Sequence, residues 1–435
     1  MSASLSVRAL TASVLAIAMS VANVCAQAQA PTAAQATPAA QPPTPATPAY
    51  LMPMLPDPKA MAARSNQSPT LSGIPTSPIA MAADKLPLDK MVLPPGFKVE
   101  TFVSGVAGAR MIYLGPKGTL FVSTARLGRI YAVKDPFGKK EVMTIAQGLT
   151  LPNGIAMKDG ALIVVANSKV FRYDAIEDTL DKPVQTDISE KFRLPGDQMH
   201  GWRYIAFGPD SKLYIAAGAY CNVCELNPGI NGNIRRYDAD GSNMEIVARG
   251  VRNTVGFDWH PVTQELWFTD NGRDWAGNEG PEDELNRIAK GKDGAFFGFP
   301  YCHANGIPDP DIKRPDPCVG VTLPAALLGP HAAAIGMKFY TGSMFPAKYR
   351  NVAFIARHGS WNREIKFGYD IVTATIDGGK AKVEPFMSGL IDKEKNVGLV
   401  RPVDFLQLQD GSLLFSDELN GAIYRISYSD AKLRK

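Results

Sequence analysis

The residues best suited to chemistry lie in two loops, each next to a run of strand-forming residues. His200 precedes the run Lys212–Ala216, and Arg252 and Asn253 precede the run Glu265–Thr269. The loop after the second run is rich in oxygen-bearing side chains: Asp270, Asn271, Asp274, Asp283 and Glu284. If both runs belong to repeated β-sheet units, these loops meet at one end of the units and form a common site.

His200 is one of five histidines in the chain. Oxidation of an alcohol carbon requires loss of the hydroxyl proton, and histidine accepts protons well near neutral pH. By position alone, a half-buried histidine that caps a turn is the simpler interpretation of His200. His331 and His358 lie in loops of small residues, so a site role and a packing role both stay open for them.

Arginine binds carboxylates with paired hydrogen bonds and stays charged when it is partly buried. Arg252, Arg363 and Arg401 stand at comparable ends of strand-like runs, so we expect them on a shared rim, with surface ion pairs as the alternative. The loop 270–274 offers oxygen ligands of the kind that calcium prefers, but it lacks the spacing of an EF-hand. A calcium site and a merely solvated loop are therefore both possible interpretations of this segment.

A unit of polar turn, short strand, loop and second strand recurs along the chain. Its six copies begin at Gly115, Leu151, Phe207, Phe257, Met337 and Arg401. Strand-like repeats of roughly 40 to 60 residues predict an all-β fold, a six-bladed β-propeller. The stretch 277–330 has few strand signals and is predicted to be a long inserted loop, a kind of segment that is often functional.

Composition divides the chain into three parts. Residues 1–30 have the positive start, apolar centre and small-residue cleavage site of a secretory signal peptide. Residues 31–91 are rich in Pro and Ala and are predicted to be a disordered linker. Residues 92–430 are assigned to the propeller domain. We expect a periplasmic or secreted protein, with a lipid anchor at Cys25 as the less favoured alternative.

Four cysteines follow the leader: Cys221, Cys224, Cys302 and Cys318. An even number in an exported protein predicts disulfides, and four cysteines allow three pairings that the sequence does not distinguish. The CxxC spacing of the first two also occurs in zinc and redox sites. In an exported all-β protein, structural bridges are the favoured interpretation.

Several phrases occur in a characteristic order: His200 with GWRYIAFGPD, GVRN, TDNGRDW followed by DELN, FGFPYC, HGSWNR, and RPVDF with DGSLLFSD. Over most of Pro94–Tyr428 they resemble the sorbosone dehydrogenase family, relatives of the soluble quinoprotein glucose dehydrogenases. The resemblance implies a six-bladed propeller. It also implies oxidation of a sugar or polyol by pyrroloquinoline quinone (PQQ), held with Ca²⁺ at the propeller mouth.

The resemblance also implies roles for single residues. His200 matches the catalytic base, and Arg252 with Asn253 matches a pair that contacts substrate and cofactor. Arg401 falls where an arginine binds the quinone. The backbone carbonyls that bind calcium in the family fall on Gly272 and Arg273. We add the nearby carboxylate of Asp270 as a third candidate ligand.

Departures from the family pattern fall in the same site. The carboxylate that orients the base aligns with Ala219, whose side chain lacks an acceptor. No lysine matches the cofactor-binding lysine, which leaves His358 or Arg363 as substitutes. An aromatic and hydroxyl pair over the quinone is replaced by a segment that ends in His331. We therefore expect a substrate other than glucose.

The sequence thus predicts an exported PQQ-dependent dehydrogenase for a sugar, sugar aldehyde or polyol. It has no CxxCH haem motif, so a separate molecule must accept the electrons. A calcium-dependent lactone hydrolase and a non-catalytic propeller that binds carbohydrate or protein are the alternatives. The net charge of +4 and the lack of a basic cluster exclude a nucleic-acid partner, and the apolar run of the leader is too short for stable membrane insertion.

Overall fold

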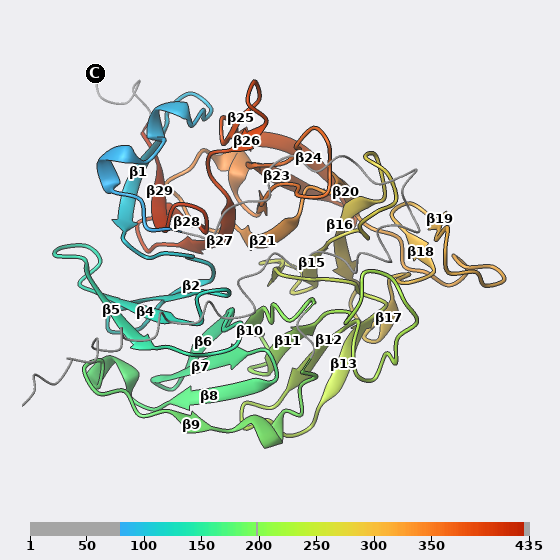
Figure 1. Ribbon diagram of the computed structural model, residues 1–435, viewed down its shortest axis with the longest axis horizontal. Coiled ribbons are helices and arrows are strands. Elements are labelled where there is room, and N and C mark those ends of the chain that lie inside the picture. Colours follow the sequence, from blue (N-terminus) through green and yellow to red (C-terminus); the bar gives the residue numbers. More distant parts are fainter. Residues whose placement is uncertain (1–78, 197–198, 430–435) are drawn as a thin grey trace, which may run out of the picture. The chain divides into compact units, whose positions relative to one another are not determined.

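Short strands separated by turns dominate residues 79–196 and 199–429, which the computed structural model describes. Helical segments in these ranges are three-residue 3-10 turns, such as η2 (Ala83–Lys85) and η6 (Ala347–Tyr349). The strands form six sheets of four or five strands around a common centre, with two additional two-stranded ribbons (Figure 1). The predicted six-bladed β-propeller is confirmed. The predicted signal peptide, 1–30, lies outside the described residues.

The first three strands of each blade follow one another in the chain, from the inner edge of the sheet outward. Blades 1 and 2 contain β2 (Ile112–Leu114), β3 (Leu120–Ser123), β4 (Ile130–Lys134) and β5 (Glu141–Ala146), then β6 (Gly154–Lys158), β7 (Ala161–Ala166), β8 (Lys169–Tyr173) and β9 (Thr186–Asp187). Blade 3 contains β10 (Ile205–Phe207), β11 (Leu213–Ala217), β12 (Asn233–Tyr237), β13 (Glu245–Arg249) and β17 (Ala295–Phe296). Blade 4 contains β14 (Phe257–Trp259), β15 (Leu266–Asp270), β16 (Glu282–Ile288) and β20 (Ala326–Pro330).

The last two blades complete the ring. Blade 5 contains β21 (Ala334–Phe339), β22 (Ala353–Arg357), β23 (Asp370–Asp377) and β24 (Lys380–Met387). Blade 6 contains β27 (Pro402–Gln407), β28 (Leu413–Asp417), β29 (Ala422–Tyr428) and, as its outermost strand, β1 (Phe97–Ser104). The first strand of the chain therefore closes the last blade, with Phe97 opposite Tyr428 and Ser104 opposite Ala422.

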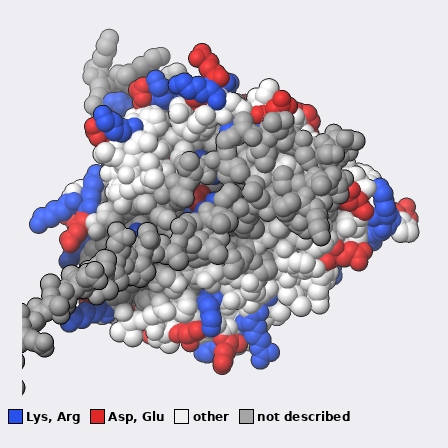
Figure 2. Space-filling view, viewed as in Figure 1, with Lys and Arg blue, Asp and Glu red and all other residues white. Residues whose placement is uncertain are grey.

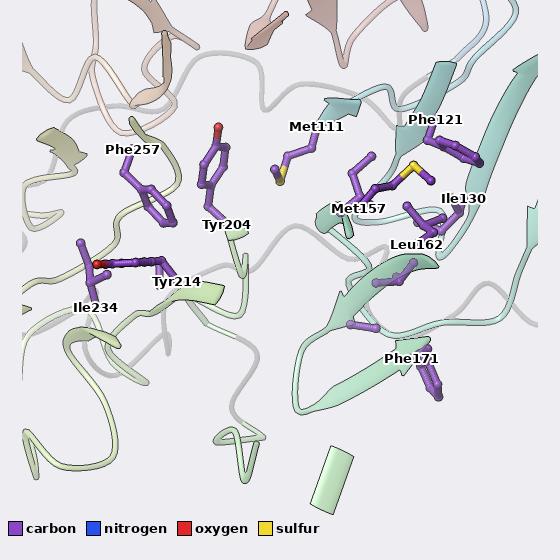
Figure 3. Packing of buried hydrophobic residues seen from close by; sticks show 14 of the residues in the cluster. Met111, Phe121, Ile130, Met157, Leu162, Phe171, Tyr204, Tyr214, Ile234 and Phe257 are labelled. Carbon is purple, nitrogen blue, oxygen red and sulfur yellow. The ribbon is translucent and has the colours of Figure 1, made fainter. Parts of the chain in front are cut away.

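The inner strands hold neighbouring blades together. Contacts join β2 to β6 and β27, β6 to β10, and β21 to β14 and β27. Between blades 3 and 4, the Tyr204 ring meets Phe257 edge to face at 4.8 Å. Figure 3 shows these two rings near Tyr214, and Met111, Phe121 and Met157 at the junction of blades 1 and 2. Strands such as β7 (sequence ALIVVA) are buried along their whole length because neighbouring blades cover both faces.

Two predicted segments are better defined by the structure. Residues 79–91, within the predicted linker, contact blade 6: Met81 N donates to Asn420 O at 2.9 Å, and Leu86 is buried. The predicted insertion 277–330 contributes β16 and β20 to blade 4. Its remainder contains the ribbon β18 (Cys302–His303) and β19 (Ile307–Pro308). Across residues 79–196 and 199–429, no helix has the length and apolar character to span a membrane.

All four cysteines of the described residues are paired. One disulfide joins Cys221 to Cys224 and the other joins Cys302 to Cys318. The prediction of structural bridges is confirmed, and the pairing that the sequence left open is the one between nearest neighbours in the chain.

Candidate active site

The candidate residues share one rim because of how each blade is folded. In an antiparallel sheet, the start of the inner strand and the end of the next strand lie at the same end. His200 and Arg252 precede the inner strands β10 and β14, while Ala219 and Asn271 follow the second strands β11 and β15. Figure 2 shows charged side chains mostly around the edge of the viewed face, with a few blue and red atoms near its centre.

His200 is buried, and its ring is oriented by the backbone of the next segment. Its Nδ1 lies 2.6 Å from the carbonyl oxygen of Ala219. A carbonyl only accepts, so Nδ1 carries the proton and Nε2 keeps a lone pair that can accept one. The expectation that Ala219 deprives the base of an orienting group is therefore corrected: the side chain lacks an acceptor, but the backbone supplies one.

Two contacts hold that carbonyl in place. Ala219 N donates to the carbonyl oxygen of Arg252 at 2.8 Å. At Gly218 the backbone passes so close to the base that an added Cβ would lie 2.6 Å from the Cβ of His200. Only glycine allows this close approach, so a side chain there would displace the base.

The charge around His200 keeps its ring neutral. Burial lowers the pKa of His200 well below its usual value, and the nearby guanidinium groups of Arg252 and Arg203 lower this pKa further. The hydrogen bond to Ala219 acts in the opposite direction but does not overcome burial. His200 is therefore neutral at neutral pH, with its one proton on Nδ1 and Nε2 able to accept another.

Arg252 donates all five of its N–H groups to the protein itself. Nε and one terminal amine bind the carbonyl and side-chain oxygens of Asn222, at 2.8 and 2.9 Å. That amine also binds the Asp274 carboxylate at 2.9 Å. The other amine binds the carbonyl oxygens of Gly272 and Asn271, at 2.8 and 3.3 Å. Because a guanidinium has five donors, none is left for a ligand, and Arg252 acts on the site through its charge and its partners.

The predicted metal residues have structural roles through their side chains. The Asp270 carboxylate accepts from the backbone N–H groups of Arg252 and Asn253, at 2.8 and 2.6 Å. Arg273 is fully buried in ion pairs with Asp309 and Asp311, each at 2.7 Å. Within the described ranges, no group of three or more His, Cys, Asp or Glu is placed to hold a metal. What the loop can offer a cation is backbone carbonyl oxygen.

A small cavity lies beside Arg252. Its lining includes Asp270, Glu284, His303 and Phe299. Its free volume of about 10 Å³ holds about one water molecule and excludes a cofactor. Burial raises the pKa of Asp270 to about 6 and that of Glu284 to about 8, so Glu284 is mostly protonated at neutral pH.

A second group of site residues centres on Glu418. Arg401 donates to Nδ1 of His358 at 2.9 Å, and Nε2 of that ring lies 2.9 Å from the Glu418 carboxylate. Glu418 also accepts from Arg110 at 2.8 Å. Burial and the charge of Arg401 lower the pKa of His358 to about 3. With polar neighbours at both ring nitrogens, His358 joins Glu418 to Arg401 and is not a free base.

Positive charge exceeds negative charge in this second group. Glu418 pairs with Arg110, while the charges of Arg110 and Arg126 act on Arg401 and that of Arg401 acts on Lys366. Repulsion by Arg126 and Arg110 adds to burial in lowering the pKa of Arg401. Burial and then Arg401 lower the pKa of Lys366 in the same way. The NH1 amine of Arg401 makes no hydrogen bond to any residue that the structure describes. The group therefore suits an anion.

The loop 358–363 connects the two groups. Its first residue, His358, contacts Arg401, and Asn362 donates to the Asp274 carboxylate at 3.1 Å. His331 also belongs to this rim: its ring Nε2 lies 2.8 Å from Gly277 O, and burial lowers its pKa. Arg363 forms the ion pair that was the alternative prediction: it pairs with the exposed Glu279 and donates to Asn278 O, and its charge also acts on His331.

The sequence did not reveal several residues that organise the site. Asn222 and Asp274 hold Arg252, while Glu418 joins His358 to Arg110. Lys366, eight positions after His358, places a buried ammonium group next to Arg401. A usable signal existed for Glu418, which directly follows a buried strand on the rim side of its blade, as Asn271 does in blade 4.

Comparisons with known proteins agree with this architecture. A family model described as glucose/sorbosone dehydrogenase matches residues 166–360. An uncharacterized protein of Borreliella burgdorferi is 33% identical over 366 residues, which cover 81% of this chain and 94% of that protein.

Two solved structures share the fold. A calcium structure of a Trichoderma reesei enzyme of Carbohydrate-Active Enzymes Family AA12 has a TM-score of 0.66 at 18% identity, covering 78% of this chain and 97% of that one. The holo form of the pyranose dehydrogenase PQQ domain from Coprinopsis cinerea has a TM-score of 0.62 at 19% identity, with the same coverage of 78% and 97%. The family model and the bacterial relative show that the chain belongs to the glucose/sorbosone dehydrogenase family.

Proposed function

We propose that this protein is an exported dehydrogenase that oxidises a sugar, sugar aldehyde or polyol with PQQ and calcium. One observation carries the proposal: a buried neutral histidine, His200, stands on a rim that also holds an excess of positive charge. The histidine suits removal of a hydroxyl proton, and the charge suits an anionic cofactor.

The second group of residues fits PQQ, which carries three carboxylates. Arg401 has an amine free of hydrogen bonds to described residues, and Arg126 and Lys366 add charge within its electrostatic range. These cations repel one another. A bound anion would attract each of them and so offset that repulsion. Bound PQQ would supply the electrophilic quinone that accepts the reducing equivalents of the substrate. Arg401, His331 and Lys366 are the residues that we assign to its binding.

In the proposed reaction, Nε2 of His200 takes the substrate hydroxyl proton. The Nδ1 hydrogen bond to Ala219 fixes the ring, so the lone pair of Nε2 keeps one direction. The charge of Arg252 disfavours a lasting imidazolium, which favours onward release of the proton. Arg252 and Asn253 also position the loop whose Gly272 and Arg273 carbonyls would hold calcium; Gly272 O, which accepts from Arg252, would use its second lone pair. The remaining calcium ligands would come from the cofactor, since calcium takes six to eight oxygens.

Export is part of the proposal. Two disulfides within the described residues favour an oxidising compartment. In this proposal, the signal peptide 1–30 directs secretion and the linker 31–91 follows it. Residues 92–430 form the catalytic domain. A separate molecule would accept the electrons.

The test is reconstitution of purified apo-protein with PQQ and Ca²⁺, followed by a screen of aldoses, sugar aldehydes and polyols with a dye acceptor. Dye reduction should require both additions and should be lost when calcium is chelated before reconstitution. A parallel screen of lactones tests the hydrolase alternative. Lactone cleavage without dye reduction would contradict the proposal, and saturable carbohydrate binding with neither activity would favour a binding protein.

A further inference from the structure

The short disulfide loop Cys221–Cys224 lies directly after the carbonyl that orients His200. From the end of β11 the chain runs through Gly218, Ala219 and Tyr220 into Cys221, and the bridge closes three residues later. Its cysteines are partly exposed and its Cα atoms are 6.1 Å apart. A ring of four residues leaves little backbone freedom for the residues that it encloses.

Asn222 lies inside this ring, and its carbonyl oxygen and both polar atoms of its side chain bind Arg252 and Asp274. Its carbonyl and its Oδ1 both accept from Arg252, at 2.8 and 2.9 Å. Oδ1 also accepts from Asp274 N at 2.8 Å, and Nδ2 donates to Asp274 O at 3.0 Å. Asn222 thus binds the guanidinium and the loop that carries its carboxylate partner.

These hydrogen bonds connect His200, Ala219, Arg252 and Asn222 into one network. Arg252 O accepts from Ala219 N, and Ala219 O binds His200. Arg252 is in turn held by Asn222, three residues beyond Ala219 in the same segment. One short stretch of chain therefore fixes both the orientation of His200 and the position of Arg252, the positive charge that acts most strongly on it.

We propose that the Cys221–Cys224 loop is the positioning element of the catalytic base, with Asn222 as its key positioning residue. A backbone carbonyl can orient the His200 ring only if the loop that carries it is held in place. The Cys221–Cys224 bridge holds this loop, and so does the work that a side-chain carboxylate would otherwise do. The effect on catalysis rests on the proposed function; the effect on the His200 ring does not.

The second disulfide provides a matched control. Cys302–Cys318 encloses a longer segment with a sequence separation of 16. Among the described residues, the enclosed side chains bind Arg273 through Asp309 and Asp311, and none hydrogen-bonds to His200 or Arg252. Removal of Cys302–Cys318 should lower stability at least as much as removal of Cys221–Cys224. The reason is that the unfolded chain gains more entropy when a longer loop is released.

The experiment compares C221S/C224S, Asn222→Ala and C302S/C318S with the wild type. Nitrogen-15 NMR of histidine-labelled apo-protein reads the tautomer and the ionisation of His200, whose signal is assigned with His200→Gln. The groups that face this ring are Arg252 and Arg203, and both stay in every variant. Thermal unfolding and the kcat and KM of the reconstituted enzyme complete the measurement.

In C221S/C224S and Asn222→Ala, we expect a mixture of tautomers and titration of His200 at higher pH. We expect kcat to fall about tenfold with little change in KM, a part of the roughly 10²- to 10⁴-fold effect of a general base. C302S/C318S should lose thermal stability with an unchanged His200 tautomer and titration.

An unchanged His200 tautomer and titration in both first variants would overturn the proposal. If C221S/C224S fails to fold, Asn222→Ala keeps the bridge and gives the same reading. If the wild type shows no dehydrogenase activity, the NMR comparison still decides the positioning role, so the two failures are distinguished.

Discussion

The imidazole Nδ1 of His200 lies 2.6 Å from the backbone carbonyl oxygen of Ala219. A backbone group thereby does what the family pattern assigns to a side-chain carboxylate at the same position. The exchange removes a negative charge from beside the base. Burial, and then the charge of Arg252, therefore lower the pKa of His200 well below its usual value.

Replacement of the base gives the first test. His200→Ala should lower kcat by roughly 10²- to 10⁴-fold, because the substrate proton loses its acceptor. Steady-state kinetics of the reconstituted enzyme measure it. His260→Gln is the control, because the His260 ring accepts from the backbone of an exposed turn and packs on Phe339, with no contact to the described rim residues. Equal loss in the two variants would contradict the role of His200.

The pH profile provides a second reading of the same base. His200 must be neutral to accept a proton, and its lowered pKa keeps it neutral below the usual range for histidine. The acid limb of kcat/KM should therefore lie below the pH expected for an ordinary histidine, near 6.5. A limb at or above that pH would show that burial and the charge of Arg252 do not lower the pKa of the base as the structure indicates.

The two arginines should behave differently on substitution. Arg401→Gln should weaken PQQ binding about tenfold or more, because a hydrogen bond to a charged group contributes about 1.5 to 3 kcal/mol. Arg252→Lys should mainly lower kcat and thermal stability, because lysine cannot replace five fixed donors. Isothermal titration with PQQ and thermal unfolding separate the two patterns. Identical losses of PQQ affinity would show that Arg252 binds the cofactor directly.

A buried carboxyl between the inner strands makes stability depend on pH. Burial raises the pKa of Asp404 to about 7, although Ile112 N donates to it at 3.1 Å and the charge of Lys338 opposes the shift. The folded form therefore holds a proton that the unfolded chain releases near its usual pKa of 3.8. The resulting stabilisation is complete below that pKa and is lost as pH rises through 7.

Asp404→Asn should remove that dependence, because the amide does not titrate. Between pH 5 and pH 8, the decrease in the free energy of unfolding should be roughly 2 kcal/mol smaller in the variant. Urea unfolding at both pH values measures it. An equal decrease in the wild type and the variant would assign the pH dependence to other groups.

Closure of the ring by β1 gives a test of the fold. The partly buried Phe97 ring contacts four aromatic rings between blades 5 and 6: Phe345, Tyr349, Phe386 and Tyr428. Phe97→Ala should lower the free energy of unfolding by about 3 kcal/mol. Val92→Ala, at a residue that is 60% exposed, should change it by less than about 0.5 kcal/mol. Similar small effects would show that β1 does not lock the ring.

The blades were predictable because their information is local. Each repeat has a strand pattern and a turn that can be read within a few residues, as in KDGALIVVANSKVFRYD. Closure by β1 was not predictable in this way, because the partner of Phe97 is Tyr428, at the other end of the domain. The short strand β20 was missed for a related reason: it pairs with β16 across a long loop.

The site was predictable in its residue types but not in its connections. The motifs identified His200, Arg252 and Arg401, which all lie on the rim. They did not reveal that all five N–H groups of Arg252 donate to other protein groups, because hydrogen-bond partners depend on loop geometry. Ala219 shows the limit most clearly, because the side chain carries no signal of what the backbone carbonyl binds.

Binding of PQQ tests the central claim most directly. Apo-protein is titrated with PQQ in excess Ca²⁺, and binding is followed by calorimetry for the wild type and Arg401→Gln. The account predicts one PQQ per chain with a dissociation constant in the micromolar range or tighter, about 8 kcal/mol or more of binding free energy, and weaker binding by the variant. Absence of saturable binding by the wild type, or equal affinity of both proteins, would contradict it.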